Sequence, residues 1–210
     1  MEHLIILIGV FAIFIPALIL PGPDFVAVVR TSMTQGTKAG LLTTLGVTLG
    51  LGLYASLSLL GLAAVLAEYY WLTWLVRVLG GSYLIYLGIK LILTKPEAID
   101  VTTPAPRRGL HPFALGFLVN MTNPKAVVLF ASVFATAITP TTPFWLMGLM
   151  IALVMTSSLF WYTLVSLFMS SAPVIKRFQN ARHWVERAAG VCFVGIGGRI
   201  LADARSPVST

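Results

Sequence analysis

Long apolar runs without a charged side chain recur along this chain and limit what it can fold into. The first run, residues 4–20, has seventeen residues and no charge. Of all 210 residues, 58% are hydrophobic and only 10% are charged, and the mean hydropathy is +0.92. Soluble domains carry about 25% charged residues. Because a helix needs about 20 apolar residues to cross a bilayer, we predict an all-α integral membrane protein.

Six transmembrane helices can be drawn over the chain, and they leave no room for a separate soluble domain. They cover residues 4–22, 39–67, 69–93, 112–138, 143–170 and 187–203. Only Glu68-Tyr69-Tyr70-Trp71 separates the second from the third, which predicts a tight hairpin with aromatic side chains at the membrane interface. Residues 94–111 form one polar linker that contains prolines. We predict a single transmembrane domain over residues 1–210.

The distribution of lysine and arginine predicts the orientation in the membrane. Ten basic residues follow the first, third and fifth spans: Arg30, Lys38, Lys90, Lys95, Arg107, Arg108, Lys176, Arg177, Arg182 and Arg187. Three lie on the opposite side: Arg77, Arg199 and Arg205. Since cytoplasmic loops are enriched in these residues, the linker is predicted in the cytoplasm and both termini outside. Met1-Glu2-His3 is not basic, so the first run is interpreted as a retained helix rather than a signal peptide.

A spacing of glycines and arginines repeats between the two halves. Arg77-x-x-Gly80 followed by Gly88 recurs as Arg187-x-x-Gly190 followed by Gly198. Residues 1–93 and 112–203 then form two three-helix units. An odd number of spans in each unit gives them opposite orientations, which is the inverted repeat common in secondary carriers.

Two proline motifs are predicted to interrupt helices. The first is Pro21-Gly22-Pro23-Asp24, and the second is Asn120-Met121-Thr122-Asn123-Pro124-Lys125. Proline removes a backbone donor and glycine tolerates unusual dihedral angles. A break at membrane depth is tolerated only where the chain is buried in protein or lines a watery cavity. One motif carries an acid and the other a base, so we interpret them together as the functional centre of a transporter.

Asp24 and Lys125 each allow two interpretations. Asp24 could carry a proton or bind a substrate ammonium, or it could cap the helix that follows. Lys125 could pair with Asp24 or bind a substrate carboxylate, or it could extend to the membrane interface. For both residues we favour the functional interpretation. Asn120 and Asn123 could either bind a zwitterion or cap the interrupted backbone.

Other residues have weaker patterns. Gly46 and Gly50, like Gly36 and Gly40, have the GxxxG spacing typical of helix packing. Trp161 and Tyr162 lie in the middle of the fifth span, where they could line a cavity or simply pack. Glu186 and Arg187 start the last span and are interpreted as an interface pair, and Cys192 as a small apolar residue.

Several function classes are not supported. His3, His111 and His183 are predicted in loops or at ends and lack the spacing of a metal site, so no metal or cofactor is expected. No phosphate-binding loop is present, which argues against an ATP-driven pump. The net charge of +7 comes from short loops between spans rather than from a nucleic-acid-binding surface.

Both motifs resemble the signatures of the LysE/RhtB amino-acid exporters. The similar stretches are Pro21-Gly22-Pro23-Asp24-Phe25, Tyr83-Leu84-Ile85-Tyr86-Leu87-Gly88 and Asn120-x-x-Asn123-Pro124-Lys125-Ala126. They occur in the order found in the family, and the resemblance covers essentially the whole chain. It implies export of amino acids such as threonine, homoserine, lysine or leucine from the bacterial cytoplasm, driven by the proton gradient.

The two motifs and the family resemblance together predict a proton-coupled exporter of small amino acids of the threonine or homoserine type in the bacterial inner membrane. Within the same family, the alternative is an exporter of leucine or lysine. Its partners would be the amino acid, the proton and lipid, and a second copy of the chain could join them in a homo-oligomer. One alternative is a membrane thiol-redox protein, which would need paired cysteines where this chain has one. Another is a passive pore or scaffold, whose behaviour would not depend on Asp24.

Overall fold

The computed structural model describes residues 2–93, 110–137, 142–168 and 172–205. Within these ranges the chain is all-α, as predicted, with no strand. The helices are α1 (Glu2–Ile19), α2 (Pro23–Gln35), α3 (Thr37–Glu68), α4 (Tyr70–Leu93), α5 (Pro112–Met121), α6 (Pro124–Ala137), α7 (Phe144–Phe168) and α8 (Ala172–Arg205). The predicted linker lies almost entirely outside the described residues.

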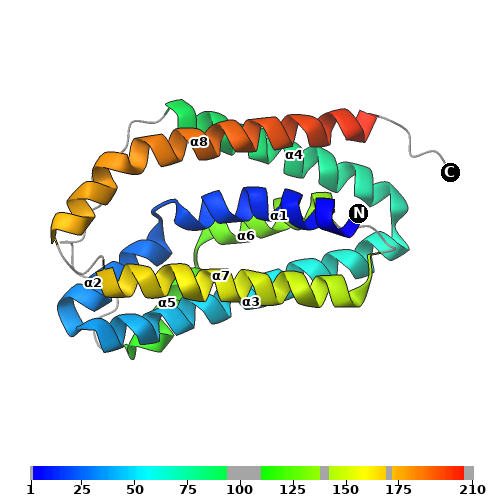
Figure 1. The fold of residues 1–210 in the computed structure, drawn as a ribbon. Coiled ribbons are helices and arrows are strands. Elements are labelled where there is room, and N and C mark those ends of the chain that lie inside the picture. The colour runs from blue at the N-terminus through cyan, green and yellow to red at the C-terminus, as the bar shows by residue number, and fades with distance from the viewer. Residues whose placement is uncertain (1, 94–109, 138–141, 169–171, 206–210) are drawn as a thin grey trace.

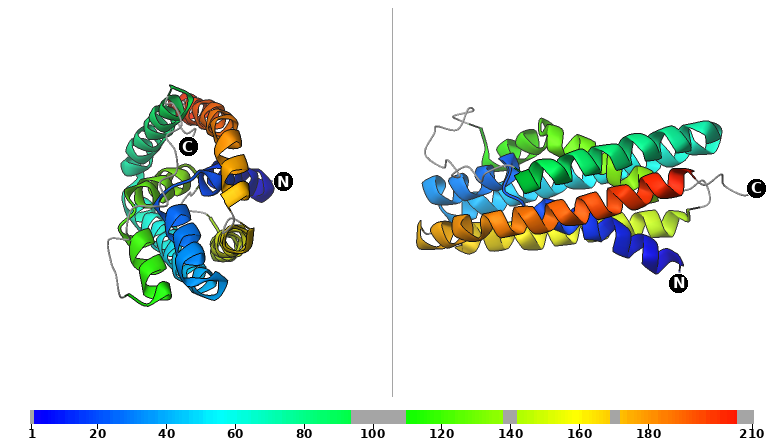
Figure 2. Two further views of the ribbon diagram at one scale, coloured as in Figure 1. Left: turned by 90° about the vertical axis from the view of Figure 1, so that its left-hand side faces the viewer. Right: turned by 90° about the horizontal axis from the view of Figure 1, so that it is seen from above.

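The longer helices run along one common direction and form a bundle (Figure 1). The α4–α8 pair lies on one side and the α3–α7 pair on the other, with α1 and α6 between them. The end-on view in Figure 2 shows the same arrangement around the central helices. The start of α1 and the end of α8 lie at the same end of the bundle. The first proline motif directly follows the end of α1 and the second leads into the start of α6, so both motifs adjoin the two helices at the centre.

Three of the described helices are long and apolar enough to cross a membrane, and they cover Thr37–Gly61, Trp74–Leu93 and Phe144–Phe168. His3–Ile19 and Pro23–Gln35 pass the same test as a pair and are bent by 45° at the break between them. The chain thus has three to four candidate spans in its described part. The fourth predicted span is divided into α5 and α6, with 10 and 14 residues, and each is too short to cross alone.

The last helix differs from its predicted boundaries. We expected it over residues 187–203, but α8 begins at Ala172 and continues to Arg205. Its first half carries charged residues, yet it also buries Ile175 and packs Phe178 against the core. A helix with one apolar and one polar face is stabilised by such packing. Glu186 and Arg187 therefore lie in the middle of a helix and not at its start.

Glycines bring the backbones of α4 and α8 into contact. Gly81 lies against the Gly197 carbonyl, and Gly88 against the Gly190 carbonyl, and each contact is reciprocal. A Cβ at Gly88, Gly190 or Gly197 would collide with the backbone of the facing helix, and one at Gly81 would be crowded by it. If the two contacts are equivalent in the two halves, Gly81 corresponds to Gly190 and Gly88 corresponds to Gly197. The alignment read from the sequence paired Gly80 with Gly190 and Gly88 with Gly198, which differs by one position. The inverted repeat of the complete halves remains a prediction.

Pro16 lies inside α1 and interrupts its hydrogen bonding. Because proline has no N–H, the Ala12 carbonyl one turn earlier loses its usual donor. The Cys192 thiol of α8 donates to this carbonyl at 3.2 Å. Cys192 therefore has a polar role at the contact between α1 and α8, which its interpretation as a small apolar residue did not include.

Candidate functional site at the two helix breaks

The two proline motifs meet through Asp24. Its carboxylate lies in the first turn of α2, directly after the break. Asn120 at the end of α5 and Asn123 between α5 and α6 both donate from Nδ2 to Oδ2 of Asp24, each at 3.0 Å. The two amides come from one break and the carboxylate from the other, so the tertiary structure joins the two motifs directly.

The carboxylate of Asp24 is almost completely out of water. Its residue is 6% exposed, and Asn120 is fully buried. Oδ1 of Asp24 and Oδ1 of Asn120 are buried without a hydrogen-bond partner among the described residues. The helix-cap interpretation of Asp24 is wrong, because Gly22 occupies the cap position of α2 and no side chain caps that helix. A buried carboxylate with an unsatisfied oxygen is uncommon and points to a role beyond packing.

Lys125 of the second motif contacts the backbone at the first break. Pro21 has no N–H, so it cannot donate to the Ala17 carbonyl four residues earlier. The Lys125 ammonium donates to this carbonyl instead, with Nζ 3.1 Å from the oxygen. The predicted salt bridge between Lys125 and Asp24 is not formed in the described structure. The ammonium lies between α1 and α8, where it contacts the freed backbone of the first break.

The second break satisfies its backbone more locally. The Asn123 side chain accepts the Lys125 N–H at 3.1 Å and so caps the start of α6. The Asn123 N–H donates to the Asn120 carbonyl at 2.9 Å. The Tyr54 hydroxyl of α3 donates to the Met121 carbonyl at 2.7 Å. Asn123 therefore has two functions, because it binds Asp24 with its amide nitrogen and caps α6 with its amide oxygen.

Glycines of α3 allow α5 to approach closely. A side chain on Gly46 would meet the backbone of α5 at Phe113 and Phe117, and one on Gly50 would meet the Asn120 amide. Gly50 thus leaves the space in which Asn120 reaches Asp24. Gly36 has a different role from the GxxxG interpretation, since it ends α2 with a φ of 86° that favours glycine.

A small cavity of about 30 Å³ lies beside Asp24, and we call it the inner cavity. Asp24, Asn123, Lys125 and Tyr162 border it, together with apolar residues of α1, α3 and α6. Its volume is about that of one water molecule. Tyr162 therefore lies on a cavity wall. Trp161 does not border the inner cavity, and its ring lies 6.4 Å from that of Phe178.

A second and much larger pocket, of about 390 Å³, lies on the other side of Lys125. We call it the α4–α8 pocket. Its polar lining consists of Tyr83, Lys90, Lys125, Arg182 and Glu186, and prolines 21 and 124 of the two breaks also line it. Lys125 borders both spaces. The two spaces have different chemistry, with the carboxylate of Asp24 at one and that of Glu186 at the other.

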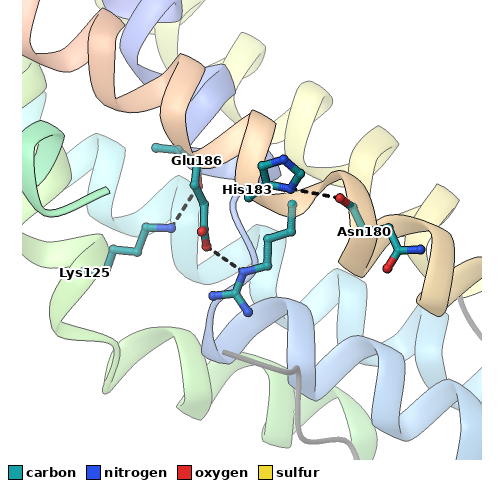
Figure 3. Close-up of polar contacts among 6 residues, drawn as sticks. Lys125, Asn180, His183 and Glu186 are labelled. Atoms are coloured by element: carbon teal, nitrogen blue, oxygen red, sulfur yellow. Dashed lines mark hydrogen bonds and ion pairs between the residues drawn. The ribbon is translucent and has the colours of Figure 1, made fainter. Parts of the chain in front are cut away.

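Glu186 is the residue of this site that the sequence analysis misplaced. It is 6% exposed, and its Oε1 accepts from Arg182 Nε at 2.6 Å. Figure 3 shows the Lys125 side chain pointing toward Glu186. Arg187, the predicted partner of Glu186, is exposed. The spacing of Arg182 and Glu186, one helical turn apart, is the signal that could have indicated this pair, had the last helix been extended backwards.

The three histidines lie in or directly beside helices. His3 lies at the start of α1, a helix end as predicted, with its ring beside that of Trp145. His183 lies inside α8 with Nδ1 3.0 Å from the Asn180 carbonyl, and not in a loop. His111 precedes α5. In the described ranges, no group of three or more histidine, cysteine, aspartate or glutamate side chains could hold a metal ion.

Comparison with known proteins decides the family. Residues 15–204 match the family model described as "LysE type translocator". The chain belongs to the LysE family. The resemblance drawn from the two motifs is thereby confirmed, and the family is described as one of translocators.

Among its relatives is the threonine efflux protein of Escherichia coli strain K12, which is 32% identical over 92% of this chain and 96% of its own length. The threonine efflux protein of Salmonella typhimurium is 30% identical over 88% of this chain and 92% of its own length. An uncharacterized membrane protein of Haemophilus influenzae is 29% identical over 86% of this chain and 88% of its own length. No solved structure matches the chain significantly.

Proposed function

We propose that this LysE-family protein exports a small neutral amino acid, of the threonine or homoserine type, across the bacterial inner membrane in exchange for protons. The observation that carries the proposal is the buried Asp24 carboxylate, held by two amides of the second break and bordering a cavity of about 30 Å³. The names of the threonine efflux relatives support the substrate class.

The proposed membrane arrangement has six crossings. The bent pair α1–α2 and the pair α5–α6 each count as one, and α3, α4, α7 and α8 supply the others. The α4–α8 pocket then lies toward the cytoplasm, because its α4 residues belong to the half of that helix nearest the basic linker. Both termini would lie outside.

In the proposed cycle, Asp24 gains and loses the proton. When it is charged, it accepts both amides and holds the two breaks together. When it is protonated, the amide contacts weaken, because hydrogen bonds to a neutral acceptor are weaker than those to a charged one. The two breaks could then separate and re-form, which would expose the site to alternate sides. One charge moving through 100 mV supplies about 2.3 kcal/mol, which corresponds to about fifty-fold accumulation.

Efflux from proteoliposomes tests this proposal. Vesicles loaded with labelled threonine, homoserine, leucine or lysine are compared with and without an imposed pH gradient. We expect threonine or homoserine to leave faster with the gradient, and Asp24→Asn to abolish the acceleration while leaving the protein folded. Gradient-driven efflux that survives in Asp24→Asn would refute the proton-carrier role. Faster export of leucine or lysine would refute the substrate assignment alone.

A further inference from the structure

The α4–α8 pocket and the inner cavity differ in what they can hold. Ligand pockets typically have volumes of about 300–1,000 Å³, and the α4–α8 pocket, at about 390 Å³, lies in this range. The inner cavity, at about 30 Å³, has room for one water molecule. In the conformation described here, an amino acid fits beside Glu186 but not beside Asp24.

The charges around the α4–α8 pocket match those of an amino-acid zwitterion. Lys90 and Lys125 offer ammonium groups, and Arg182 offers a guanidinium that already binds Glu186. Glu186 is the acidic residue among those that line the pocket. A zwitterion brings one carboxylate and one ammonium, so it needs a partner of each sign, and this pocket contains both.

Glu186 is prepared to bind a cation. It is 6% exposed, so its carboxylate is largely removed from bulk water. Arg182 Nε occupies one of its oxygens at 2.6 Å and fixes its orientation on the same helix. An ionised carboxylate has about four acceptor positions. A substrate ammonium can therefore bind while the contact with Arg182 remains.

We propose that the exported amino acid binds in the α4–α8 pocket, with its ammonium on Glu186 and its carboxylate on Lys90 and Lys125. This inference rests on the proposed function. It assigns substrate recognition to Glu186 and leaves Asp24, behind Lys125, for the proton. Lys125 borders both spaces. A substrate carboxylate that attracts the Lys125 ammonium would therefore weaken the hydrogen bond from Lys125 to the Ala17 carbonyl. Substrate binding would thereby loosen a contact that holds the first helix break.

Equilibrium binding to the purified protein in lipid nanodiscs tests the assignment by calorimetry. The probes are L-threonine, 3-hydroxybutyrate, which lacks the ammonium, and threoninol, which lacks the carboxylate. The variant is Glu186→Gln, which keeps the size of the side chain. Asp203→Asn is the matched control, because Asp203 is an exposed carboxylate of the same helix outside the α4–α8 pocket. Lys90→Gln tests the carboxylate end.

We expect Glu186→Gln to weaken threonine binding about ten- to hundred-fold, as for the loss of one charged hydrogen bond. Binding of 3-hydroxybutyrate should stay unchanged or become tighter, which also shows that the variant is folded. Lys90→Gln should weaken threonine and 3-hydroxybutyrate alike, and spare threoninol. Asp203→Asn should behave as the unmodified protein.

Two results would overturn the inference. One is an equal loss of threonine and 3-hydroxybutyrate binding in Glu186→Gln, which would make the effect structural. The other is unchanged threonine binding in Glu186→Gln together with its loss in Asp24→Asn, which would place the ammonium at Asp24. In either case, threonine efflux by the unmodified protein would leave the proposed function standing. Absence of efflux of every amino acid tested would count against the proposed function itself.

Discussion

The two helix breaks solve the same problem in different ways. In both, proline leaves a backbone carbonyl without its helical donor. At the first break, the Ala17 carbonyl is satisfied by the Lys125 side chain, which comes from a helix more than a hundred residues away. At the second, the Asn120 carbonyl is satisfied by the neighbouring Asn123 N–H. The first break depends on distant partners, whereas the second is largely complete in itself.

This difference indicates which break is the more easily changed. The bend between α1 and α2 is held by Asn120, Asn123 and Lys125, and all three belong to the second break. A joint shift of α5 and α6 would remove these contacts together. The second break would lose its contacts to Asp24, but it would keep its own cap, which Asn123 makes to the neighbouring Lys125 N–H. We therefore expect the second break to act as the anchor and the first to respond to it.

The largest effect should follow from removing the amides. The double variant Asn120→Ala with Asn123→Ala leaves the Asp24 carboxylate buried without a donor, which costs about 3–5 kcal/mol. At about 2–4 °C per kcal/mol for a chain of this length, the apparent melting temperature in nanodiscs should fall by about 6–20 °C. Asp24→Asn should cost much less, because its amide oxygen can still accept both bonds.

A rescue experiment separates buried charge from lost packing. Adding Asp24→Leu to the double variant removes the unpaired carboxylate, and it should restore much of the melting temperature, since an apolar replacement of a complete polar cluster is often nearly neutral. No recovery would mean that the asparagines act through packing, and the breaks would then be joined by shape rather than by the carboxylate.

An intermediate effect should distinguish the two asparagines. Asn123→Ala loses a bond to Asp24 and also the cap of α6, whereas Asn120→Ala loses only the bond. A helix cap contributes about 1 kcal/mol, so Asn123→Ala should melt about 2–4 °C lower than Asn120→Ala. Asn123→Ser can cap α6 but is too short to reach Asp24 in the same way, and it should recover this difference. Equal melting of the two alanine variants would contradict the double role of Asn123.

The smallest changes in stability should come from replacing the prolines. These variants compare the two breaks directly, because each restores one missing backbone N–H. Pro21→Ala supplies an N–H that can donate to the Ala17 carbonyl and displace the distant Lys125 side chain. Pro124→Ala supplies one to the Asn120 carbonyl, which already accepts a backbone N–H of the same break. Removal of a loop-compatible proline costs about 0.4–1 kcal/mol. We expect this loss for Pro124→Ala and a smaller one for Pro21→Ala.

Hydrogen exchange gives the direct readout of the proline variants. The new amide at position 21 should be protected from exchange, and the new amide at position 124 should exchange faster. The reverse order would show that the first break is the self-sufficient one.

The sequence by itself determined the features that depend on local composition. Apolar runs with few charges predict membrane helices because unpaired backbone groups and charges are costly in lipid. The prolines predict where those helices break, since a missing N–H acts within a few residues of its position. The positions of both breaks are therefore confirmed, and so is the family that their motifs resemble.

Only the tertiary structure decided which side chains meet. Opposite charges predicted that Asp24 would pair with Lys125, but Asp24 binds two amides and Lys125 binds a backbone carbonyl. Glu186 was placed at a helix end, yet it lies inside a longer helix and faces Lys125. Such pairings depend on how each helix is rotated against its neighbours and on which freed carbonyl lies nearest. That information arises from packing between residues far apart in the sequence, so no local pattern contains it.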